Sequence, residues 1–407
     1  MLNIGSFKPL SELCSIISSG GTPSRKIPHY FDKNGHLWVK SKELLFKGID
    51  DTEEKISDEG LKKSSAKYYP SGTILVAMYG ANVGQLAWLK KPATVNQAIC
   101  ALVVNEQKAD NMFVYYSLLH TREKLIVQAQ GAAQQNLNAG QIKSFEIPYI
   151  DLENQQKIAS ILSTYDDLIE NNNRRIAILE EMARNLYREW FVKFRFPGHE
   201  EVKMIDSELG QIPEGWEIVK YTDIIDVMSG GTPKTDNEQF WNGGIPFFTP
   251  KDAGTNSFCI ETIKELSEQG LKKCNSRLYP QNTVFITARG TVGKVVLAGR
   301  NMAMNQSCYA LQRKIGIGQI FVYQLTLERV NHLKKNASGA TFDAIVVDTF
   351  ERMKVIKPPL SLTDHFETKA QSIFALILNL SKRNQNLKTQ RDMLLPKLIS
   401  GKIEIAE

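Results

Sequence analysis

The fold of this chain follows from one stretch, Ile158–Trp190, which reads IASILSTYDDLIENNNRRIAILEEMARNLYREW. Its apolar residues recur at alternating spacings of four and three, the heptad rhythm of a helix that pairs with another helix. The seam positions are Ile158, Leu162, Tyr165, Ile169, Asn172, Ile176, Leu179, Ala183, Leu186 and Trp190. Because neither proline nor glycine interrupts residues 151–196, we predict one helix of about 40 residues, roughly 60 Å long, that needs a partner.

A second stripe with the same rhythm lies near the C-terminus. Its seam positions are Phe366, Ala370, Ile373, Ile377, Leu380, Asn384, Leu387, Arg391 and Leu394. Pro396 and Gly401 are predicted to end this helix. Each stripe alone would also fit a surface helix on a globular core, but two uninterrupted stripes of matching length favour pairing with each other.

Composition places the chain among soluble globular proteins. Its 407 residues are too many for one ordinary domain and indicate two or three. The net charge of +6 permits a polyanionic partner without requiring one. Five cysteines without a Cys-x-x-Cys pair argue against both a disulfide framework and a zinc site, and we find neither a signal peptide nor a membrane span. We therefore expect a cytoplasmic protein that has no contact with a membrane.

An internal repeat organises the whole chain. Ser19-Gly20-Gly21-Thr22-Pro23 returns as Ser229-Gly230-Gly231-Thr232-Pro233, 210 positions later. Further matches at offsets of 208 to 210 pair Leu61 with Leu271, Tyr69 with Tyr279, Asn96-Gln97 with Asn305-Gln306, Phe113 with Phe321, Ile169 with Ile377, and Leu179 with Leu387. The chain is thus one unit written twice, a globular domain followed by a long helix.

Each globular domain is predicted to mix α and β structure. Residues 73–79 and 283–287 are short, apolar, β-branched runs, typical of buried strands, and residues 113–128 and 321–334 have helical spacing. The predicted fold class is α+β, with two similar mixed α/β domains joined by two long helices that form an antiparallel coiled coil. The predicted segments are residues 1–150, 151–196, 197–360 and 361–407, in the order domain, helix, domain, helix.

Three stretches resemble the specificity subunit of a type I restriction-modification system. They are the paired Gly-Gly-Thr-Pro openings, the central Leu186-Tyr187-Arg188-Glu189-Trp190-Phe191 leading to Phe196-Pro197-Gly198, and the closing Arg391-Asp392-Met393-Leu394-Leu395-Pro396-Lys397-Leu398-Ile399-Ser400-Gly401. The resemblance covers nearly the whole chain, although Ile212–Trp216 has no counterpart before the first repeat.

The resemblance implies two target recognition domains, each reading one half of a split site in double-stranded DNA. It also implies that the helices set the spacing between the two half-sites and dock two methyltransferase subunits. Restriction (helicase-nuclease) subunits would be further partners in the complex. Catalysis would belong to those partners, so S-adenosylmethionine, ATP and Mg²⁺ are expected there and no cofactor on this chain.

The residues themselves offer no catalytic motif. The only Pro-Pro, Pro358-Pro359, lacks the flanks of an adenine methyltransferase motif, and Gly290–Lys294 is too short for a P-loop and fits a turn between strands. The six histidines are scattered singly, without zinc-ligand spacing. The repeated Gly-Gly-Thr-Pro is predicted to be a structural turn; the alternative is that its amides lie against a phosphate.

Base reading is expected where the two copies differ, since identical loops would read identical half-sites. Side-chain amides suit adenine and arginine or lysine suits guanine. The candidate DNA-binding residues are Lys40, Lys42, Tyr79, Asn82, Gln85, Gln134, Gln135 and Asn136 in the first copy, and Thr249, Lys251, Arg289, Thr291, Lys294 and Asp343 in the second. The competing interpretation is that Arg289 and Lys294 only neutralise phosphates and that the amides are ordinary loop residues.

The two asparagine layers predict the register of the helix pair. A twofold-related antiparallel pair places Asn172 opposite Asn384 and Ile176 opposite Leu380, one polar layer beside one apolar layer. A stand-alone nuclease or methyltransferase would need the missing motifs, and a purely structural coiled coil would not need two domains with divergent loops. Another non-catalytic two-domain DNA-binding scaffold stays the alternative to a specificity subunit.

Overall fold

The computed structural model describes residues 6–129, 136–314, 316–336 and 344–403. The chain divides into two compact units, each holding one globular domain and part of each long helix. Unit 1 comprises residues 1–169 and 386–407, and unit 2 comprises residues 170–385. The long helices are therefore shared between the two units. The sequence instead predicted each long helix to be a segment separate from the domains.

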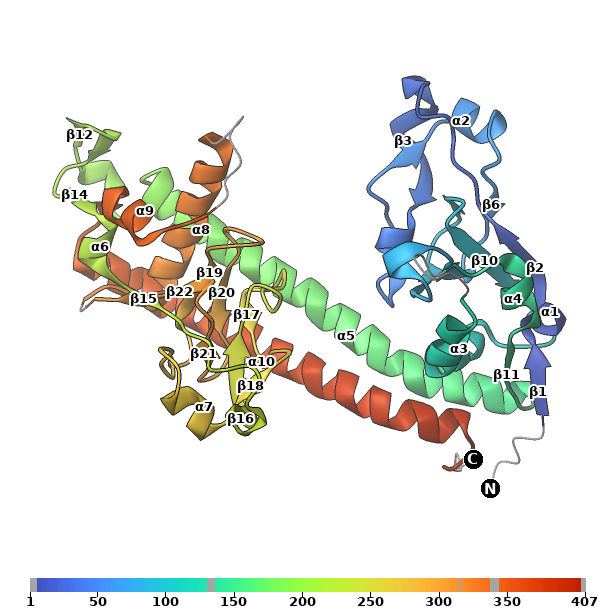
Figure 1. Ribbon diagram of the computed structural model, residues 1–407. Helices are drawn as coiled ribbons and strands as arrows, with labels where there is room; N and C mark the ends of the chain where they lie inside the picture. Colours follow the sequence, from blue (N-terminus) through green and yellow to red (C-terminus); the bar gives the residue numbers. More distant parts are fainter. Residues whose placement is uncertain (1–5, 130–135, 315, 337–343, 404–407) are drawn as a thin grey trace. The chain divides into compact units, whose positions relative to one another are not determined.

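Unit 1 contains three sheets (Figure 1). Its strands are β1 (Ser6–Pro9), β2 (Cys14–Ser19), β3 (Phe31–Val39), β4 (Gly48–Ile49), β5 (Lys55–Ile56), β6 (Tyr68–Tyr69), β7 (Ile74–Ala77), β8 (Leu86–Leu89), β9 (Ala93–Val95), β10 (Ile99–Val104) and β11 (Glu146–Tyr149). Strands β1 and β11 pair, a five-stranded sheet has the order β2-β10-β7-β8-β4, and a four-stranded sheet has the order β5-β3-β9-β6. Its shorter helices are α1 (Leu10–Leu13), α2 (Asp58–Lys62), α3 (Asn111–Val127) and α4 (Ala139–Ser144).

Unit 2 repeats this topology. Its strands are β12 (Met204–Ser207), β13 (Gly210–Pro213), β14 (Glu217–Lys220), β15 (Ile225–Ser229), β16 (Trp241–Phe248), β17 (Phe258–Cys259), β18 (Glu265–Leu266), β19 (Val284–Thr287), β20 (Val295–Ala298), β21 (Ala303–Met304), β22 (Cys308–Arg313) and β23 (Lys354–Lys357). Its shorter helices are α6 (Tyr221–Ile224), α7 (Glu268–Lys272), α8 (Gln319–Asn336) and α9 (Val347–Arg352). The orders β14-β23 and β15-β22-β19-β20-β17 match those of unit 1, and β18-β16-β21 matches three of the four strands of its second sheet. The counterpart of β6 is reduced to an isolated bridge between Tyr279 and Met302.

The matching topology confirms the internal repeat and the mixed α/β class. The predicted buried strands are β7 and β19, and the predicted helices are α3 and α8. The match also resolves where the first repeat begins, because β1 pairs with β11 as β14 pairs with β23. The β12–β13 hairpin holds the unmatched Ile212 and precedes the repeated part of unit 2.

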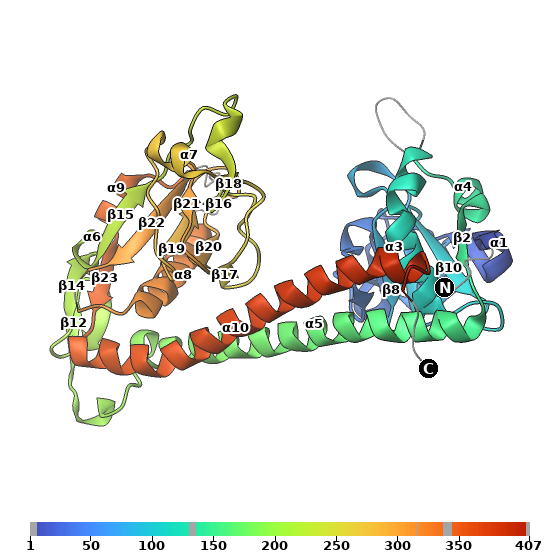
Figure 2. The ribbon, with the colours of Figure 1, turned by 90° about the horizontal axis from the view of Figure 1, so that it is seen from below.

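Both faces of the five-stranded sheets are buried, and successive side chains of a strand pack on opposite faces. In β7, Ile74 and Val76 join the core formed with α3, whereas Leu75 and Ala77 pack against the second sheet. In β19, Val284 belongs to the core that contains α8 residues. Because successive strand residues point to opposite faces, a strand covered on both sides has to be apolar throughout. In both views α3 and α8 each lie against the sheet of their own unit (Figure 2).

The two long helices are α5 (Leu152–Tyr187) and α10 (Leu360–Ile399). In unit 1, Ile158 and Leu162 of α5 share a buried cluster with Leu395 and Leu398 of α10. In unit 2, a second cluster contains α5 and α10 residues together with Phe321 of α8. The helices therefore run antiparallel within each unit, as predicted.

The register also agrees with the sequence. Asn172 Nδ2 donates to Asn384 Oδ1 at 2.8 Å, and Asn384 Nδ2 donates to Asn173 Oδ1 at 2.8 Å. Ile176 and Leu380 are 2 % and 3 % exposed and belong to one apolar cluster. A polar layer thus lies beside an apolar layer within unit 2.

Both helix ends differ from the predicted ones. Residues 188–192 continue α5 as a π-helical turn, closed by the Lys193 amide donating to Arg188 O, and Phe194 then takes a left-handed φ of 57°. The wider turn goes with the burial of two adjacent rings, Trp190 and Phe191, which both pack on Phe366. The prediction of helix up to Phe196 was therefore wrong by four residues.

Helix α10 starts at Leu360 and continues through Pro396 to Ile399. Pro396 therefore does not end the helix, contrary to the prediction. Proline removes its own amide donor and its ring crowds the carbonyl four residues earlier, but its own carbonyl still accepts, and the Ser400 amide donates to Pro396 O at 3.1 Å. The helix ends instead before Gly401, whose φ of 65° suits glycine.

Candidate nucleic-acid interface

The repeated Gly-Gly-Thr-Pro and Asn-Gln motifs contact each other in both units. Thr22 Oγ1 bonds to Gln97 Oε1 in unit 1, and Thr232 Oγ1 bonds to Gln306 Oε1 in unit 2. The Gly21 amide donates to Val95 O at 2.9 Å, as the Gly231 amide does to Met304 O at 3.1 Å. In each unit these bonds therefore link the chain just after β2 or β15 to the second sheet, at β9 or β21.

Close packing explains these glycines better than an unusual turn does. A Cβ on Gly20 would lie 2.0 Å from Val95 O, and one on Gly230 would lie 2.3 Å from Met304 O. Neither glycine has a φ in the left-handed region, so the predicted reason, a turn closed to other residues, was wrong. The Gly21 and Gly231 amides donate within the fold and do not face a phosphate.

In unit 1 the structure brings two candidate residues from separate loops together, Tyr79 and Asn136. Tyr79, 43 % exposed, forms an isolated β-bridge with the exposed Asn136, and the Leu137 amide donates to Met78 O at 2.8 Å. Asn82 and Gln85 are half-buried in the loop between β7 and β8. Gln134 and Gln135 lie outside the described residues. Tyr79 and Asn136 are therefore the best placed of these candidates to meet a ligand.

The ammonium of Lys40, a candidate DNA-binding residue, is paired with two carboxylates of its own unit. Its Nζ lies 2.8 Å from Glu54 Oε1 and 2.9 Å from Glu53 Oε2, and its side chain is 14 % exposed. Burial alone would lower the pKa of Lys40, but hydrogen bonds to Glu54 and Glu53 outweigh burial and raise it. A DNA phosphate would have to compete with both carboxylates. Lys42 is exposed but is also paired, 2.7 Å from Glu53.

In unit 2 four predicted residues line one cavity of about 660 Å³: Thr249, Lys251, Arg289 and Thr291. Arg289 and Lys251 are exposed and carry positive charge at its mouth. Gly290–Lys294 lies between β19 and β20, which confirms the predicted turn between strands. The Ile345 amide donates to Ala288 O at 3.0 Å, so Ile345, which follows the candidate Asp343 in the chain, lies beside Arg289. Asp343 lies outside the described residues.

Two predicted residues of unit 2 serve the fold. Lys294 Nζ donates to Ala253 O at 2.7 Å and ties the β19–β20 loop to the loop after β16. Thr249 donates from its amide and its hydroxyl to Asp252 Oδ2, at 2.8 and 2.6 Å, while the Ile263 amide donates to Asp252 Oδ1 at 2.7 Å. In unit 1, Glu43 makes the same kind of bridge between the Lys40 and Glu53 amides.

Sequence reasoning missed the aromatic wall of this cavity. Trp241 and Phe247 line it as an edge-to-face pair with centroids 5.5 Å apart, and Lys264 Nζ lies 5.0 Å from the Trp241 ring centroid. The signal was present in the repeat, because Lys264 occupies the position of Glu54, 210 residues earlier, with the charge reversed.

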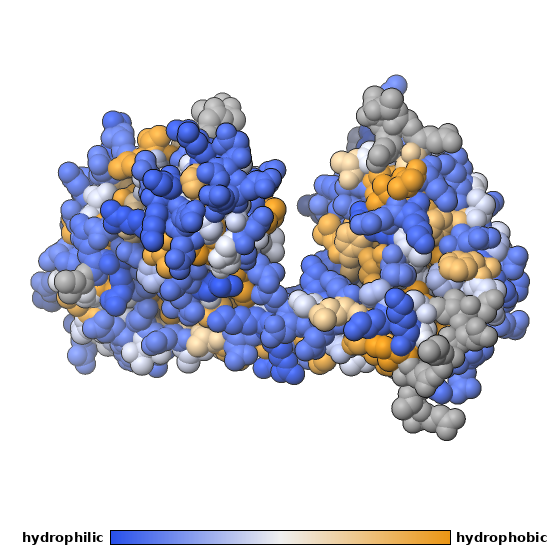
Figure 3. Space-filling model, turned by 60° about the horizontal axis from the view of Figure 1, so that its bottom comes forward, coloured by the Kyte–Doolittle hydropathy of each residue, from blue (hydrophilic) through white to orange (hydrophobic). Residues whose placement is uncertain are grey.

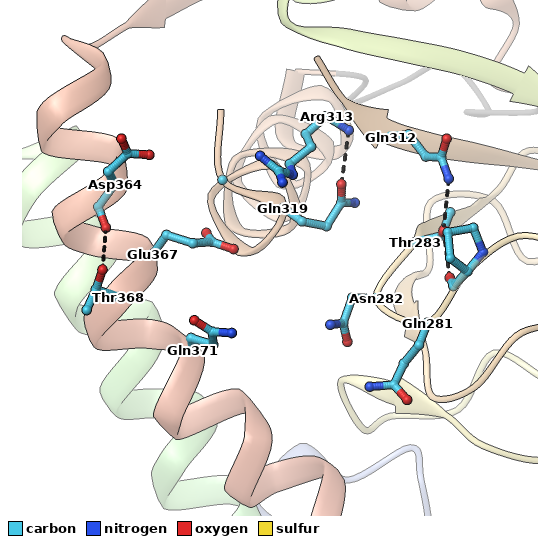
Figure 4. Close-up of a pocket in the computed structure, with 12 residues that line it drawn as sticks. Gln281, Asn282, Thr283, Gln312, Arg313, Gln319, Asp364, Glu367, Thr368 and Gln371 are labelled. Atoms are coloured by element: carbon cyan, nitrogen blue, oxygen red, sulfur yellow. Dashed lines mark hydrogen bonds between the residues drawn. The ribbon is translucent and has the colours of Figure 1, made fainter. Parts of the chain in front are cut away.

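A second cavity of about 640 Å³ in unit 2 is polar (Figure 4). Two of its side chains bond to nearby backbone amides: Gln319 Oε1 accepts from the Arg313 amide at 3.0 Å, and Glu367 accepts from the Ile320 amide at 3.1 Å. Glu367 projects from α10 toward the first turn of α8 and caps it, and burial raises the pKa of its carboxyl. This cavity lies between α10 and the globular domain of unit 2.

A carboxylate caps the equivalent helices α3 and α8, but it comes from a different place in each unit. In unit 1, Asp110 caps α3 by accepting from the Phe113 amide at 2.9 Å. Gly318 stands 208 positions after Asp110, and a Cβ there would lie 2.2 Å from Glu367 Oε2. The carboxylate therefore comes from the same domain in unit 1 and from α10 in unit 2.

Within the described part of the chain, no three His, Cys, Asp or Glu side chains gather in a group that could hold a metal ion. None of its helices is long and apolar enough to cross a membrane.

Comparisons with known proteins agree with this architecture. The profile of the family described as "Type I restriction modification DNA specificity domain" matches residues 6–181 and 213–391. The type I restriction enzyme MjaIX specificity subunit of Methanocaldococcus jannaschii is 29 % identical over 96 % of this chain and 92 % of its own length. The HindI specificity subunit of Haemophilus influenzae is 24 % identical over 69 % of this chain and 74 % of its own length.

A solved structure shares the fold. The chain superimposes on the S subunit of the type I restriction-modification system from M. genitalium with a TM-score of 0.59 and 17 % identity, covering 98 % of this chain and 96 % of that one.

Proposed function

This chain belongs to the family of type I restriction-modification specificity subunits, and from that premise we propose that its two units read the two halves of one split DNA site. The observation that supports this division is the repeated topology with different side chains at the same loops. Tyr79 in unit 1 stands where Ala288 precedes Arg289 in unit 2, directly after the matching strands β7 and β19. Equal frameworks with unequal loops suit unequal half-sites.

The host methylome tests this proposal. We expect a bipartite methylated motif that disappears when the gene for this chain is deleted and returns when it is restored. A motif that persists in the deletion strain would assign the specificity to another protein.

We propose that the helix pair sets the distance between the half-sites and docks two methyltransferase subunits. Leu168 and Leu376, 208 positions apart in equivalent helices, are 37 % and 41 % exposed. Figure 3 shows apolar residues scattered over a mainly hydrophilic face of the molecule. Two related apolar positions suit two copies of one partner.

Native mass spectrometry of the complex tests the docking. Leu376→Glu should remove one methyltransferase subunit, and Leu168→Glu together with Leu376→Glu should remove both. Two bound subunits in the double variant would place the docking surface elsewhere.

We propose that catalysis belongs to the partner subunits, which would bind S-adenosylmethionine, ATP and Mg²⁺. The purified chain alone should then neither methylate nor cleave DNA nor hydrolyse ATP. Methyl transfer by the isolated chain, free of other subunits, would refute this. We also propose a cytosolic location, because all five cysteines are free thiols.

A further inference from the structure

The cavity of unit 2 beside Trp241 has chemistry suited to a planar, negatively charged ligand. Its wall includes the rings of Trp241 and Phe247, and its lining includes three cationic residues, Lys251, Lys264 and Arg289. Among the residues that the structure describes, the one carboxylate that lines it is Asp252, which is occupied by the bonds from Thr249 and Ile263 described above. Aromatic rings with surrounding cations are what a base and its phosphate require.

Unit 1 fills the corresponding space with its own side chains. Arg25, at the position of Thr235, places its guanidinium 4.5 Å from the Phe31 centroid and 5.2 Å from the Trp38 centroid. Phe31 and Trp38 correspond to Trp241 and Phe247 and form the same edge-to-face pair, at 5.8 Å. Glu54 then holds Arg25 at 2.6 Å.

Unit 2 has lost both members of that ion pair. The position of Arg25 is a threonine, and that of Glu54 is Lys264, so no guanidinium from this position covers the rings. The cation near Trp241 is instead the Lys264 ammonium, 5.0 Å from the ring centroid. Trp241 Nε1 is buried, and among the described residues no group accepts a hydrogen bond from it.

We propose that this cavity takes up one unstacked base from the second half-site, stacked against Trp241 with its phosphate facing Lys251 and Arg289. The inference rests on the proposed function and deepens it, because it gives unit 2 a means of specificity that unit 1 lacks. Unit 1, with Arg25 over its rings, reads an intact duplex.

The test closes the cavity by installing the residues of unit 1. The variant Thr235→Arg with Lys264→Glu recreates the Arg25–Glu54 pair over an aromatic pair of the same geometry. Duplexes with 2-aminopurine at each position in turn are bound to the full complex with its methyltransferase subunits. Fluorescence rises where the probe is unstacked, and the base that the methyltransferase itself extrudes contributes equally in both proteins.

The wild-type complex should show a rise at one position of the second half-site that the variant loses, with an unchanged profile over the first half-site. Identical profiles for both proteins over the second half-site would overturn the proposal while leaving specific binding intact. A complex that binds no specific sequence would instead overturn the proposed function itself.

A wild-type measurement covers the case of a misfolded variant. Duplexes carrying 5-iododeoxyuridine at the unstacked position are irradiated in the complex, and the cross-linked residue is mapped by mass spectrometry. Cross-links to Trp241 or Phe247 support the proposal, and cross-links confined to residues outside the cavity overturn it.

Discussion

Replacing Asn384 by leucine tests whether the asparagine layer fixes the register of the helix pair. Asn172 is 4 % exposed, and its Nδ2 donates to Asn384 Oδ1 at 2.8 Å. Asn384→Leu removes this acceptor and the bond to Asn173, so a buried amide loses its partner. Such a loss costs about 1–3 kcal/mol.

The double variant Asn172→Leu with Asn384→Leu should recover most of that loss. It replaces both partners by apolar groups in a seam that already holds Ile176 and Leu380, so no buried amide stays unpaired. The two substitutions should therefore be non-additive by roughly 0.5–3 kcal/mol in the free energy of unfolding.

Urea unfolding of the full chain, followed by circular dichroism of the helices, measures these free energies. The matched control is Asn171→Leu, an exposed neighbour on the same helix, which should change stability by less than about 0.5 kcal/mol. Additive effects of the two seam substitutions would refute the argument, since they would show that Asn172 and Asn384 do not depend on each other.

Three further predictions concern unit 2. Arg289→Ala should cost about 1–3 kcal/mol at one position of one half-site, measured by competition binding, whereas a uniform loss over unrelated DNA with a smaller salt dependence would assign Arg289 to phosphate. Gly230→Ala should destabilise the fold by about 1–3 kcal/mol because the added Cβ would meet Met304 O. The control Gly254→Ala should not, since its Cβ would have no atom within 4 Å, and equal melting temperatures of the two variants would contradict this. Because burial raises the pKa of Glu367 above its ordinary 4.5, its contribution to stability is lost as pH rises through the folded pKa, so Glu367→Gln should gain stability relative to the wild type as pH rises from 4.5 through that pKa; a difference that is constant with pH would contradict this.

The sequence predicted the architecture well because periodicity and duplication are long-range signals. The heptad positions placed Asn172 opposite Asn384, and the offset between copies identified β7 with β19 and α3 with α8. The ends of the helices were less predictable, since the π-helical turn depends on how Trp190 and Phe191 pack on Phe366, a residue far away in sequence.

Single site residues were harder to predict, because a lysine looks the same in sequence whether it is paired or free. Lys40 and Lys294 are bound by Glu54 and by Ala253 O, partners that only the fold brings near. Comparing the copies for charge reversals, rather than for loop differences alone, would have pointed to Lys264.

The most direct test of the account is to lengthen the helix pair and read the methylated site. Inserting one heptad after Asn173 and one after Ser381 keeps the seam in phase and adds about 10 Å. At 3.4 Å per base pair the spacer should grow by about three base pairs, with both half-site sequences unchanged because no recognition loop is altered. Methylome sequencing of a host that carries the extended variant with its methyltransferase gives the spacer directly; an active complex with an unchanged spacer would contradict the claim that these helices set the distance.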